Sequence, residues 1–243
     1  MLITAGASGI GLAIATAFSS AGAKVHIVDV RQPADARTFS FTQADLAETA
    51  AVPTAVSEAA ECMGGIDVLV NNLGVAGAQQ PFECLDIATF MQTLRINVGT
   101  AVGFISEVLP QMRERRQGVI LNISSVSVAT VPHGRSDYNA SKAAIESVTR
   151  SVAREAGPYG IRCNAVRPGM VDNPRMRSIM DELARKAGTT SEDIESEQLK
   201  FISMGTAVDE ADVANLCLFL ASDQASRITG QVVSACGGLS WEP

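Results

Sequence analysis

The chain alternates short apolar runs with longer stretches in which apolar residues recur at the spacing of one helix face. The short runs are bounded by Gly, Asp or Asn and are typical of buried strands; they cover residues 25–28, 66–70, 119–123, 161–166 and 231–234. Helical spacing marks intervening stretches such as 10–18 and 144–152. This repeated strand–helix order predicts an α/β fold, a doubly wound parallel sheet with right-handed crossovers.

One stretch, from Pro174 to Gly205, departs from this order because it is polar and lies between two strand–helix units. It predicts helices over residues 178–186 and 191–201. Insertions at the carboxyl ends of strands often build substrate sites, and a solvated helical excursion without ligand contact is the alternative. No linker, repeat or low-complexity tract divides the sequence, so we expect one domain over residues 1–243 with an insertion at about 174–205.

Composition supports the same fold and narrows the function. Hydrophobic residues make up 47% of the chain and aromatic residues only 5%, so we expect a core of Ala, Val, Ile and Leu, as in a parallel sheet with helices on both faces. The net charge of −7 disfavours nucleic acid as a partner, because an acidic surface repels phosphates. No apolar run approaches the roughly 20 residues that cross a bilayer, so no membrane association is expected.

The N-terminus and the cysteines bear on where the protein is located. Residues 1–3 lead directly into a Gly-rich turn, so no signal peptide is expected. The five cysteines are scattered and lack the spacing of metal ligands. We therefore expect free thiols, no metal site and a cytoplasmic protein.

A Gly-rich segment, Thr4–Gly11, follows the short first strand and opens a helix. Small residues let the backbone approach a pyrophosphate, and the N-terminus of the helix supplies N–H groups with partial positive charge. The position between strand and helix predicts a dinucleotide site. The residues predicted to contact the cofactor here are Ala5, Ala7, Ser8, Gly9, Ile10 and Gly11.

The second predicted strand ends at Asp29, 20 residues after Gly9. A carboxylate at that place accepts hydrogen bonds from the adenosine ribose and repels a 2′-phosphate, so it favours NAD over NADP. Arg31, two residues later, partly offsets that repulsion. The alternative interpretation is a strand-end Asp that only caps a turn.

Tyr138 and Lys142 lie four residues apart and thus on one face of a helix. A phenol is a poor base at neutral pH because its pKa is about 10. An ammonium at about 4 Å stabilises the phenolate by ~4 kcal/mol at an effective dielectric constant near 20, before desolvation costs. The pair therefore suits general acid–base chemistry, although an exposed helix face gives the same spacing by chance.

Further motifs accompany the pair: Asn71-Asn72-Leu73-Gly74 after a strand, Ser125 thirteen residues before Tyr138, and Pro168-Gly169 after a later strand. With the Gly-rich turn, these motifs resemble the short-chain dehydrogenase/reductase family in order and spacing over essentially the whole chain. The resemblance implies a Rossmann-type sheet of about seven strands, usually a homotetramer, and a catalytic tetrad. The tetrad residues are Asn97, Ser125, Tyr138 and Lys142.

The resemblance also implies a role for each tetrad residue. Tyr138 would be the general acid/base at the substrate oxygen, and Ser125 would orient that oxygen. Lys142 would hold the nicotinamide ribose hydroxyls and lower the pKa of Tyr138. Asn97 would hold a water that links Lys142 to solvent, whereas Ser124 would satisfy local backbone.

Cofactor contacts outside the Gly-rich turn follow from the same resemblance. Asp45 and Leu46 would contact the adenine, and Asn72 would support the sheet and the cofactor near the adenosine. Val171 would bind the nicotinamide carboxamide through its backbone. The remaining predicted cofactor contacts are Tyr138, Lys142, Pro168, Gly169 and Asn173.

Four positions depart from the family pattern. Ala5 replaces the first glycine of the turn, and Leu73 replaces an alanine, which would crowd the adenosine pocket. Asn173 replaces a Thr that bonds the carboxamide, and an amide can do the same. Cys236 replaces an Asp before the final Gly-Gly.

Four basic residues flank the predicted site and bear on the substrate. His133 and Arg135 lie between Ser125 and Tyr138, while Arg175 and Arg177 follow Pro168-Gly169. They are candidates to receive a carboxylate, sulfonate or phosphate of the substrate. Ion pairs with neighbouring Asp or Glu, or exposure to solvent, are the alternative.

We therefore expect an NAD(H)-dependent oxidoreductase that interconverts a secondary alcohol and a ketone, with a small molecule as its substrate. One alternative within the family is an NADPH-dependent 3-oxoacyl-thioester reductase, which Asp29 and the acidic composition disfavour. An alternative of another class is a non-catalytic dinucleotide-binding regulator, because a fold does not fix a function.

Overall fold

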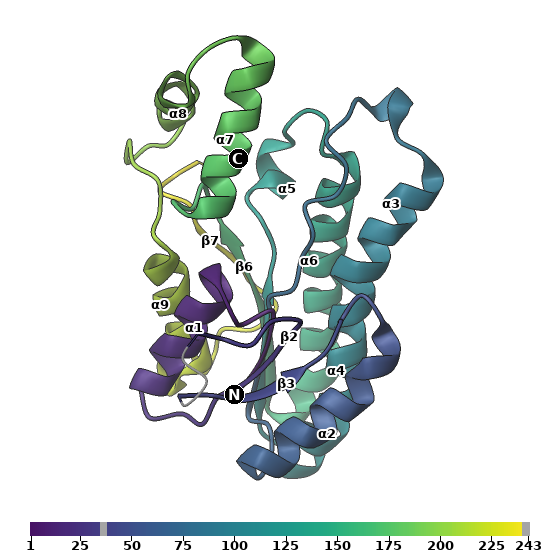
Figure 1. Ribbon diagram of the computed structural model, residues 1–243. Helices are drawn as coiled ribbons and strands as arrows, with labels where there is room; N and C mark the ends of the chain where they lie inside the picture. Colours follow the sequence, from purple (N-terminus) through teal and green to yellow (C-terminus); the bar gives the residue numbers. More distant parts are fainter. Residues whose placement is uncertain (35–37, 240–243) are drawn as a thin grey trace.

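A computed structural model describes residues 1–34 and 38–239 (Figure 1). Its centre is a seven-stranded sheet in which every pairing is parallel, with the order β3-β2-β1-β4-β5-β6-β7. The strands are β1 (Leu2–Thr4), β2 (His26–Asp29), β3 (Ser40–Gln43), β4 (Val68–Asn71), β5 (Gly118–Ile123), β6 (Ile161–Pro168) and β7 (Val232–Ala235). The predicted doubly wound α/β fold is confirmed.

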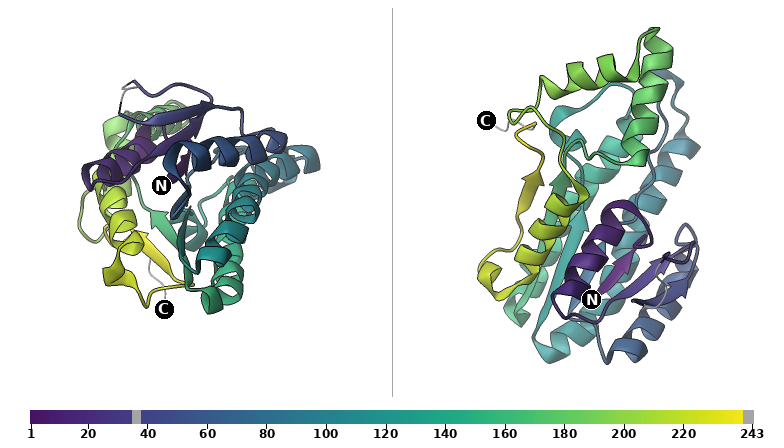
Figure 2. Two further views of the ribbon diagram at one scale, coloured as in Figure 1. Left: turned by 90° about the horizontal axis from the view of Figure 1, so that it is seen from below. Right: turned by 60° about the vertical axis from the view of Figure 1, so that its left-hand side comes forward.

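Helices cover both faces of the sheet (Figures 1 and 2). α1 and α9 pack together on one face, and α2, α4 and α6 cover the other. The long helices are α1 (Gly9–Ser20), α2 (Val52–Met63), α3 (Ile87–Leu94), α4 (Thr100–Arg115), α6 (Ser136–Ala156), α7 (Pro174–Ala187), α8 (Ser191–Leu199) and α9 (Glu210–Ala221), and the single turn α5 covers Ser127–Thr130.

Both faces of the central strands are buried, which explains why these strands appear in the sequence as continuous apolar runs. Neighbouring residues of one strand point to opposite faces. Ile120 therefore belongs to the core under α2, α4 and α6, while Leu121 belongs to the core under α1 and α9. Few aromatic side chains are needed because branched aliphatic residues fill both layers.

One strand, β3, was not predicted from the sequence. Its sequence, Ser-Phe-Thr-Gln, is polar because the strand lies at the edge of the sheet and buries little of its surface. Its hydroxyl groups bond a buried histidine of β2: His26 Nδ1 lies 2.9 Å from Ser40 Oγ, and its Nε2 lies 2.9 Å from Thr42 Oγ1. Side-chain hydrogen bonds thus replace apolar contacts at this edge.

The polar stretch after β6 forms α7 and α8, which rise above the carboxyl ends of the strands (Figure 2). Asn173 caps α7 by accepting a hydrogen bond from the Met176 amide at 2.9 Å. The inner side of this segment packs on a small core of Met170, Met180 and Ile202. α7 therefore packs against the fold through Met180 and Ala184, whereas α8 buries none of its residues. None of the helices within residues 1–34 and 38–239 has the length and hydropathy to cross a membrane.

Candidate active site

The Gly-rich turn between β1 and α1 brings its backbone close to the strand and to the loop after β4. A Cβ on Gly11 would lie 2.3 Å from the Ala5 carbonyl oxygen and 2.6 Å from Asn72 Nδ2, so only glycine fits there. Asn72 Nδ2 donates to the Ala5 carbonyl at 2.9 Å, which ties the two segments together. Ser8 precedes the helix, so the amides of its first turn point out of the N-terminus.

Ala5 has φ of 51° and Gly9 has φ of 59°. Both values lie in the left-handed region, which a glycine adopts without strain and an alanine does not. The turn thus keeps the backbone path of a glycine although Ala5 carries a methyl group. The path is held by a hydrogen bond from the Ala5 amide to the Val28 carbonyl at 2.8 Å.

Asp29 ends β2 beside this turn and is buried. Its Oδ2 accepts from the Ala7 amide at 3.0 Å, and its Oδ1 accepts from the Arg31 amide at 3.1 Å. The carboxylate therefore does cap a turn, as the alternative interpretation held, but it also fixes the Gly-rich turn. Each oxygen keeps further acceptor capacity, so this bonding is compatible with the predicted ribose contact.

The predicted adenine contacts lie after the adjacent strand. β3 pairs with β2 up to Gln43, and Asp45 follows as an exposed residue whose Oδ1 accepts from the Ala47 amide at 2.9 Å. Leu46 is buried, and its side chain belongs to the core under α2 and α4. Leu73 also packs against that core.

The tetrad residues come from separate elements and meet at the carboxyl end of β5. Tyr138 and Lys142 lie one turn apart on α6, and Ser125 follows β5. Lys142 is buried, and its Nζ donates to the Ile123 carbonyl at 2.8 Å and lies 5.7 Å from the centroid of the Tyr138 ring. Ser125 is within hydrogen-bonding reach of the Tyr138 phenol.

These neighbours set the acidity of Tyr138. Burial alone would raise the pKa of the phenol, but the Lys142 charge, the hydrogen bond with Ser125 and the charges of Arg175 and Arg135 outweigh burial and hold the pKa below 10.0. Burial is also the main reason why the pKa of Lys142 is lowered. The arrangement favours phenolate formation, as general acid–base work requires.

Asn97 lies in a π-helical turn, Arg95–Gly99, between α3 and α4. Its Nδ2 donates to the Val75 carbonyl at 3.1 Å and to Ser141 Oγ at 2.9 Å, and its Oδ1 accepts from the Val75 amide at 2.8 Å. Asn97 thus joins the loop after β4 to α6 beside Lys142. π-Turns of this kind occur frequently at functional sites. The predicted water link to Lys142 stays a prediction.

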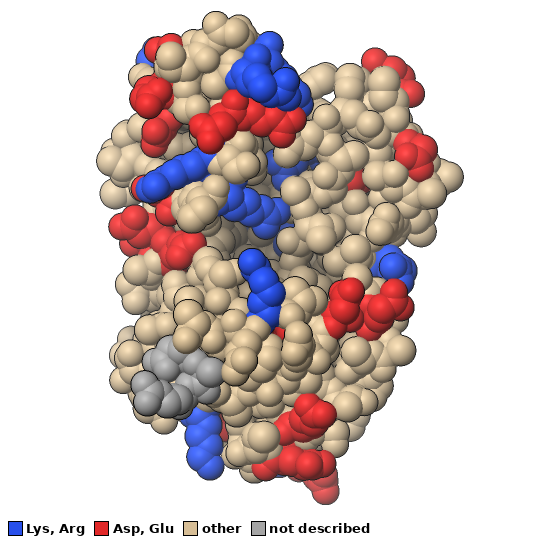
Figure 3. Space-filling view, viewed as in Figure 1, with Lys and Arg blue, Asp and Glu red and all other residues tan. Residues whose placement is uncertain are grey.

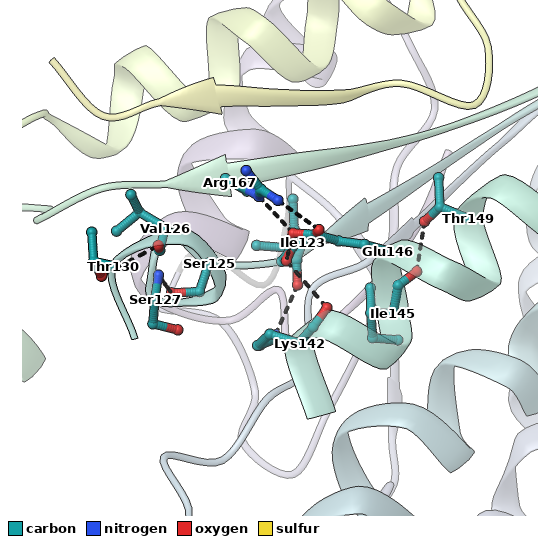
Figure 4. Close-up of polar contacts among 11 residues, drawn as sticks. Ile123, Ser125, Val126, Ser127, Thr130, Lys142, Ile145, Glu146, Thr149 and Arg167 are labelled. Atoms are coloured by element: carbon teal, nitrogen blue, oxygen red, sulfur yellow. Dashed lines mark hydrogen bonds and ion pairs between the residues drawn. The ribbon is translucent and has the colours of Figure 1, made fainter. Parts of the chain in front are cut away.

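Ser124, Glu146 and Arg167 form a buried polar cluster that links α6 to the ends of β5 and β6. Figure 4 shows Glu146 and Arg167 of this cluster. Arg167 Nε and Nη2 lie 2.6 and 2.7 Å from the two carboxylate oxygens of Glu146. Ser124 was expected to satisfy local backbone; its hydroxyl lies 3.4 Å from the Lys142 carbonyl but only 2.7 Å from Glu146 Oε1. The main acceptor of Ser124 is therefore a carboxylate.

The sequence analysis missed Glu146 and Arg167. Two features of the sequence would have drawn attention to them. Glu146 continues the spacing of four that relates Tyr138 to Lys142, and Arg167 interrupts an apolar strand just before Pro168. A charge in a buried strand requires a partner of opposite sign.

Ser125, Tyr138 and Lys142 border a cavity of about 330 Å³ between α7 and the carboxyl ends of the strands, whereas Asn97 does not line it. Its walls include the following residues that the sequence predicted: Ile10, Asn72, Ser125, Arg135, Tyr138, Lys142, Pro168, Gly169, Val171, Asn173 and Arg175. Gly169 has no room for a side chain because a Cβ would lie 2.6 Å from the Cys236 Cα. A second hollow of about 420 Å³ between α7 and α8 contains none of the tetrad.

Val171 lines this cavity and pairs with Val208. The Val208 amide donates to the Met170 carbonyl at 2.9 Å, and the Asp172 amide donates to the Val208 carbonyl at 3.0 Å. Because backbone groups alternate in direction along an extended segment, the amide and carbonyl of Val171 face away from Val208. Asn173 uses Oδ1 to cap α7, which leaves its Nδ2 as the donor toward a carboxamide.

The four basic residues have different surroundings. Arg177 forms an exposed ion pair with Asp172 at 3.0 Å, and His133 is exposed and does not line the cavity. Arg135 Cζ lies 4.4 Å from the centroid of the Tyr138 ring, and Arg175 lines the same cavity. The alternative therefore holds for Arg177, which is paired, and for His133, which is exposed. Arg135 is half-buried and lines the cavity, and Arg175 is exposed to solvent but also lines the cavity.

Comparisons with known proteins agree with this geometry. A family model of the short-chain type, described as "Enoyl-(Acyl carrier protein) reductase", matches residues 4–240. Levodione reductase of Leifsonia aquatica is 33% identical over 99% of this chain and 93% of its own length. A 3-oxoacyl-(acyl-carrier-protein) reductase of Chlamydia trachomatis is 30% identical over 98% of this chain and 96% of its own length. An NAD+-bound xylitol dehydrogenase structure has a TM-score of 0.91 at 26% identity, covering 98% of this chain and 97% of that one.

The chain belongs to the short-chain dehydrogenase/reductase family. Like the relatives named above, it is an oxidoreductase that acts on CH–OH groups. Enzymes of this family bind nicotinamide dinucleotides as cofactors. The residues present fit such a cofactor: the Gly-rich turn opens the N-terminus of α1, Asp29 bonds the same turn, and one cavity is lined by both Ile10 of α1 and Tyr138.

Proposed function

We propose that this protein interconverts a secondary alcohol and a ketone with NAD(H), using Tyr138 as the general acid/base. The observation that carries the proposal is the environment of the Tyr138 phenol, which has Ser125 within hydrogen-bonding reach, Lys142 on the same helix face and a pKa lowered by both. A protein that only sensed a dinucleotide would have no need of an activated phenol.

Each tetrad residue then has one task. During oxidation the Tyr138 phenolate takes the proton of the substrate hydroxyl, and during reduction the neutral phenol returns a proton to the substrate oxygen. Ser125 orients that oxygen with its hydroxyl. The nicotinamide, when bound, accepts or donates the hydride. Lys142 binds the adjoining ribose hydroxyls and stabilises the phenolate, and Asn97 holds the loop and helix that surround Lys142.

NAD is the proposed dinucleotide because of Asp29. Two backbone amides hold its carboxylate at the end of β2, so the negative charge lies at a fixed place beside the Gly-rich turn. A 2′-phosphate brought to that place would be repelled. An Asp29→Asn variant keeps the shape of the side chain and removes the charge. It should raise the ratio of kcat/KM with NADP to kcat/KM with NAD by at least about tenfold, which corresponds to 1.4 kcal/mol.

The direct test follows nicotinamide absorbance with NAD and NADP against secondary alcohols, and with the reduced cofactors against the matching ketones. Turnover with NAD on a secondary alcohol supports the proposal. Turnover with NADPH alone on 3-oxoacyl thioesters would replace it with the reductase alternative. Tight dinucleotide binding without turnover on either panel would favour the regulator.

The predicted homotetramer stays a prediction, and light scattering tests it. The exposed apolar side chains Phe82, Ile87 and Met91 on and before α3 support a face that meets another subunit. A stable monomer at working concentration would contradict it. The cytoplasmic location likewise stays a prediction, which fractionation of the source cells would test.

A further inference from the structure

Arg135 lies directly against the reacting group of the proposed mechanism. Its guanidinium carbon is 4.4 Å from the centre of the Tyr138 ring, and both residues line the cavity. Its Nε is buried and has no hydrogen-bond partner among the described residues. A buried donor without an acceptor is costly, and a guanidinium has further N–H donors, so an anion in the cavity would offset this cost by accepting from them.

Arg175 reaches the same cavity from the first turn of α7. Its closest polar contact is a long one, 3.5 Å from Nη1 to the Gly74 carbonyl. The charge of Arg175 lowers the pKa of Tyr138, of Lys142 and of Arg135, so it lies within electrostatic range of all three. Two arginines thus face one cavity and repel each other. Figure 3 shows basic side chains gathered around the hollow below α7.

No carboxylate of the described residues pairs with either arginine. Asp137 is the nearest acid in sequence, but it is buried, and its oxygens already accept from the Ala78 amide, the Thr93 hydroxyl and the Tyr138 amide. Arg177 makes the contrast clear, because it lies two residues from Arg175 and is paired with Asp172. Asp137 and the Tyr138 phenolate act on Arg135 only through their electric field, so neither arginine forms an ion pair within the described residues.

We propose that Arg135 and Arg175 form a subsite for a carboxylate or sulfonate carried by the substrate, so that the protein acts on anionic hydroxy or keto compounds. This inference rests on the proposed function and names its substrate class. A guanidinium offers a planar pair of donors that suits both oxyanions. The anion at the two arginines would also place the carbinol carbon beside Tyr138, because Arg135 lies across the ring of that residue.

The test compares charged and uncharged substrates of the same size, because their ratio cancels any effect of Arg135 on the acidity of Tyr138. One pair is 3-hydroxybutanoate and 3-hydroxybutanamide. A series of methyl carbinols that end in carboxylate or sulfonate, with one to six atoms between the carbinol carbon and the anion, distinguishes the two oxyanions and finds the spacing. The variants are Arg135→Met and Arg175→Met, and the matched control is Arg177→Met on the same helix.

The proposal predicts that at least one acid of the series is preferred over its uncharged partner in kcat/KM. Each of the two variants should reduce this preference by about 10- to 100-fold, as expected for a lost charge-assisted hydrogen bond. Arg177→Met should leave it unchanged. Turnover of neutral alcohols without any preference for the acids would overturn the subsite while leaving the proposed function in place.

Two further outcomes separate this inference from other causes. If Arg175→Met raises the dissociation constant of NAD and leaves the acid preference intact, Arg175 binds a cofactor phosphate and the two-arginine subsite is wrong. If no alcohol is turned over, the proposed function fails. In that case, titration of the NADH complex with 3-oxobutanoate and with a keto sulfonate decides the subsite: binding that both variants weaken at least tenfold supports it, and no binding refutes it.

Discussion

The buried ion pair between Glu146 and Arg167 gives a sharp prediction about stability. The two side chains are 4% and 7% exposed, and both carboxylate oxygens of Glu146 are bonded by the guanidinium. Glu146→Gln keeps the shape of the side chain but removes its charge. The buried Arg167 cation is then left without this carboxylate, and the Ser124 hydroxyl loses an ionised acceptor.

Removing the charge of one partner of a buried ion pair typically lowers the free energy of unfolding by about 3–5 kcal/mol, because the remaining charge stays buried without its counter-charge. For a domain of 150–250 residues, each kcal/mol lowers the melting temperature by about 2–4 °C. Glu146→Gln should therefore lower Tm by roughly 6–20 °C. The exposed pair of Asp172 and Arg177 is the matched control: its side chains are 47% and 72% exposed, so Asp172→Asn should cost less than about 1 kcal/mol.

Thermal unfolding followed by circular dichroism, with urea unfolding as a second measure, compares the two variants. The double variant Glu146→Gln/Arg167→Met should recover part of the loss, because no buried cation remains. Equal Tm values for Glu146→Gln and Asp172→Asn would refute the reasoning. A double variant that loses more stability than the sum of the losses in Glu146→Gln and Arg167→Met would also refute it.

Three more predictions follow from the geometry. Ala5→Gly should raise the free energy of unfolding by about 0.5–1 kcal/mol, because Ala5 has a positive φ; a loss of stability in urea unfolding would contradict this. Gly11→Ala should lower the free energy of unfolding by about 1–3 kcal/mol, because the new methyl group meets the Ala5 carbonyl oxygen at 2.3 Å. It should also weaken NAD binding measured by calorimetry, and unchanged affinity would argue against a role of this turn in cofactor binding. For alcohol oxidation, log kcat/KM should rise with pH to a plateau and reach its midpoint below 10.0, since only the phenolate of Tyr138 accepts the proton. Lys142→Met should move that midpoint upward, and an unmoved midpoint would assign the ionisation to another group.

The extent to which sequence predicted the fold depends on burial. β2, β4, β5 and β6 are largely buried and were recognised as apolar runs, with ends within two residues of those observed. The half-buried edge strand β7 was recognised from its two valines, whereas the other edge strand, β3, was missed because its residues are polar where they bond His26. Pattern alone also gave no reason to expect the π-turn that holds Asn97.

The residues of the candidate site also differ in how well the sequence predicts their positions. Tyr138, Lys142 and Ser125 could be placed from spacing, because one turn of α6 and the end of β5 bring them together. The partners of the arginines could not, because Arg175 and Arg177 have the same sequence environment and point to different neighbours. Side-chain direction depends on contacts between segments far apart in the chain, which spacing does not report.

The central claim is that Tyr138 transfers the proton, and the most direct test is Tyr138→Phe with Tyr159→Phe as the control. Tyr159 does not line the cavity of the tetrad, and Arg113 and Arg116 cover its ring. Turnover of the best alcohol with NAD should fall by roughly 10²- to 10⁴-fold in Tyr138→Phe, while the dissociation constant of NADH changes little and Tyr159→Phe stays active. A Tyr138→Phe variant that retains turnover close to that of the parent protein would contradict the account.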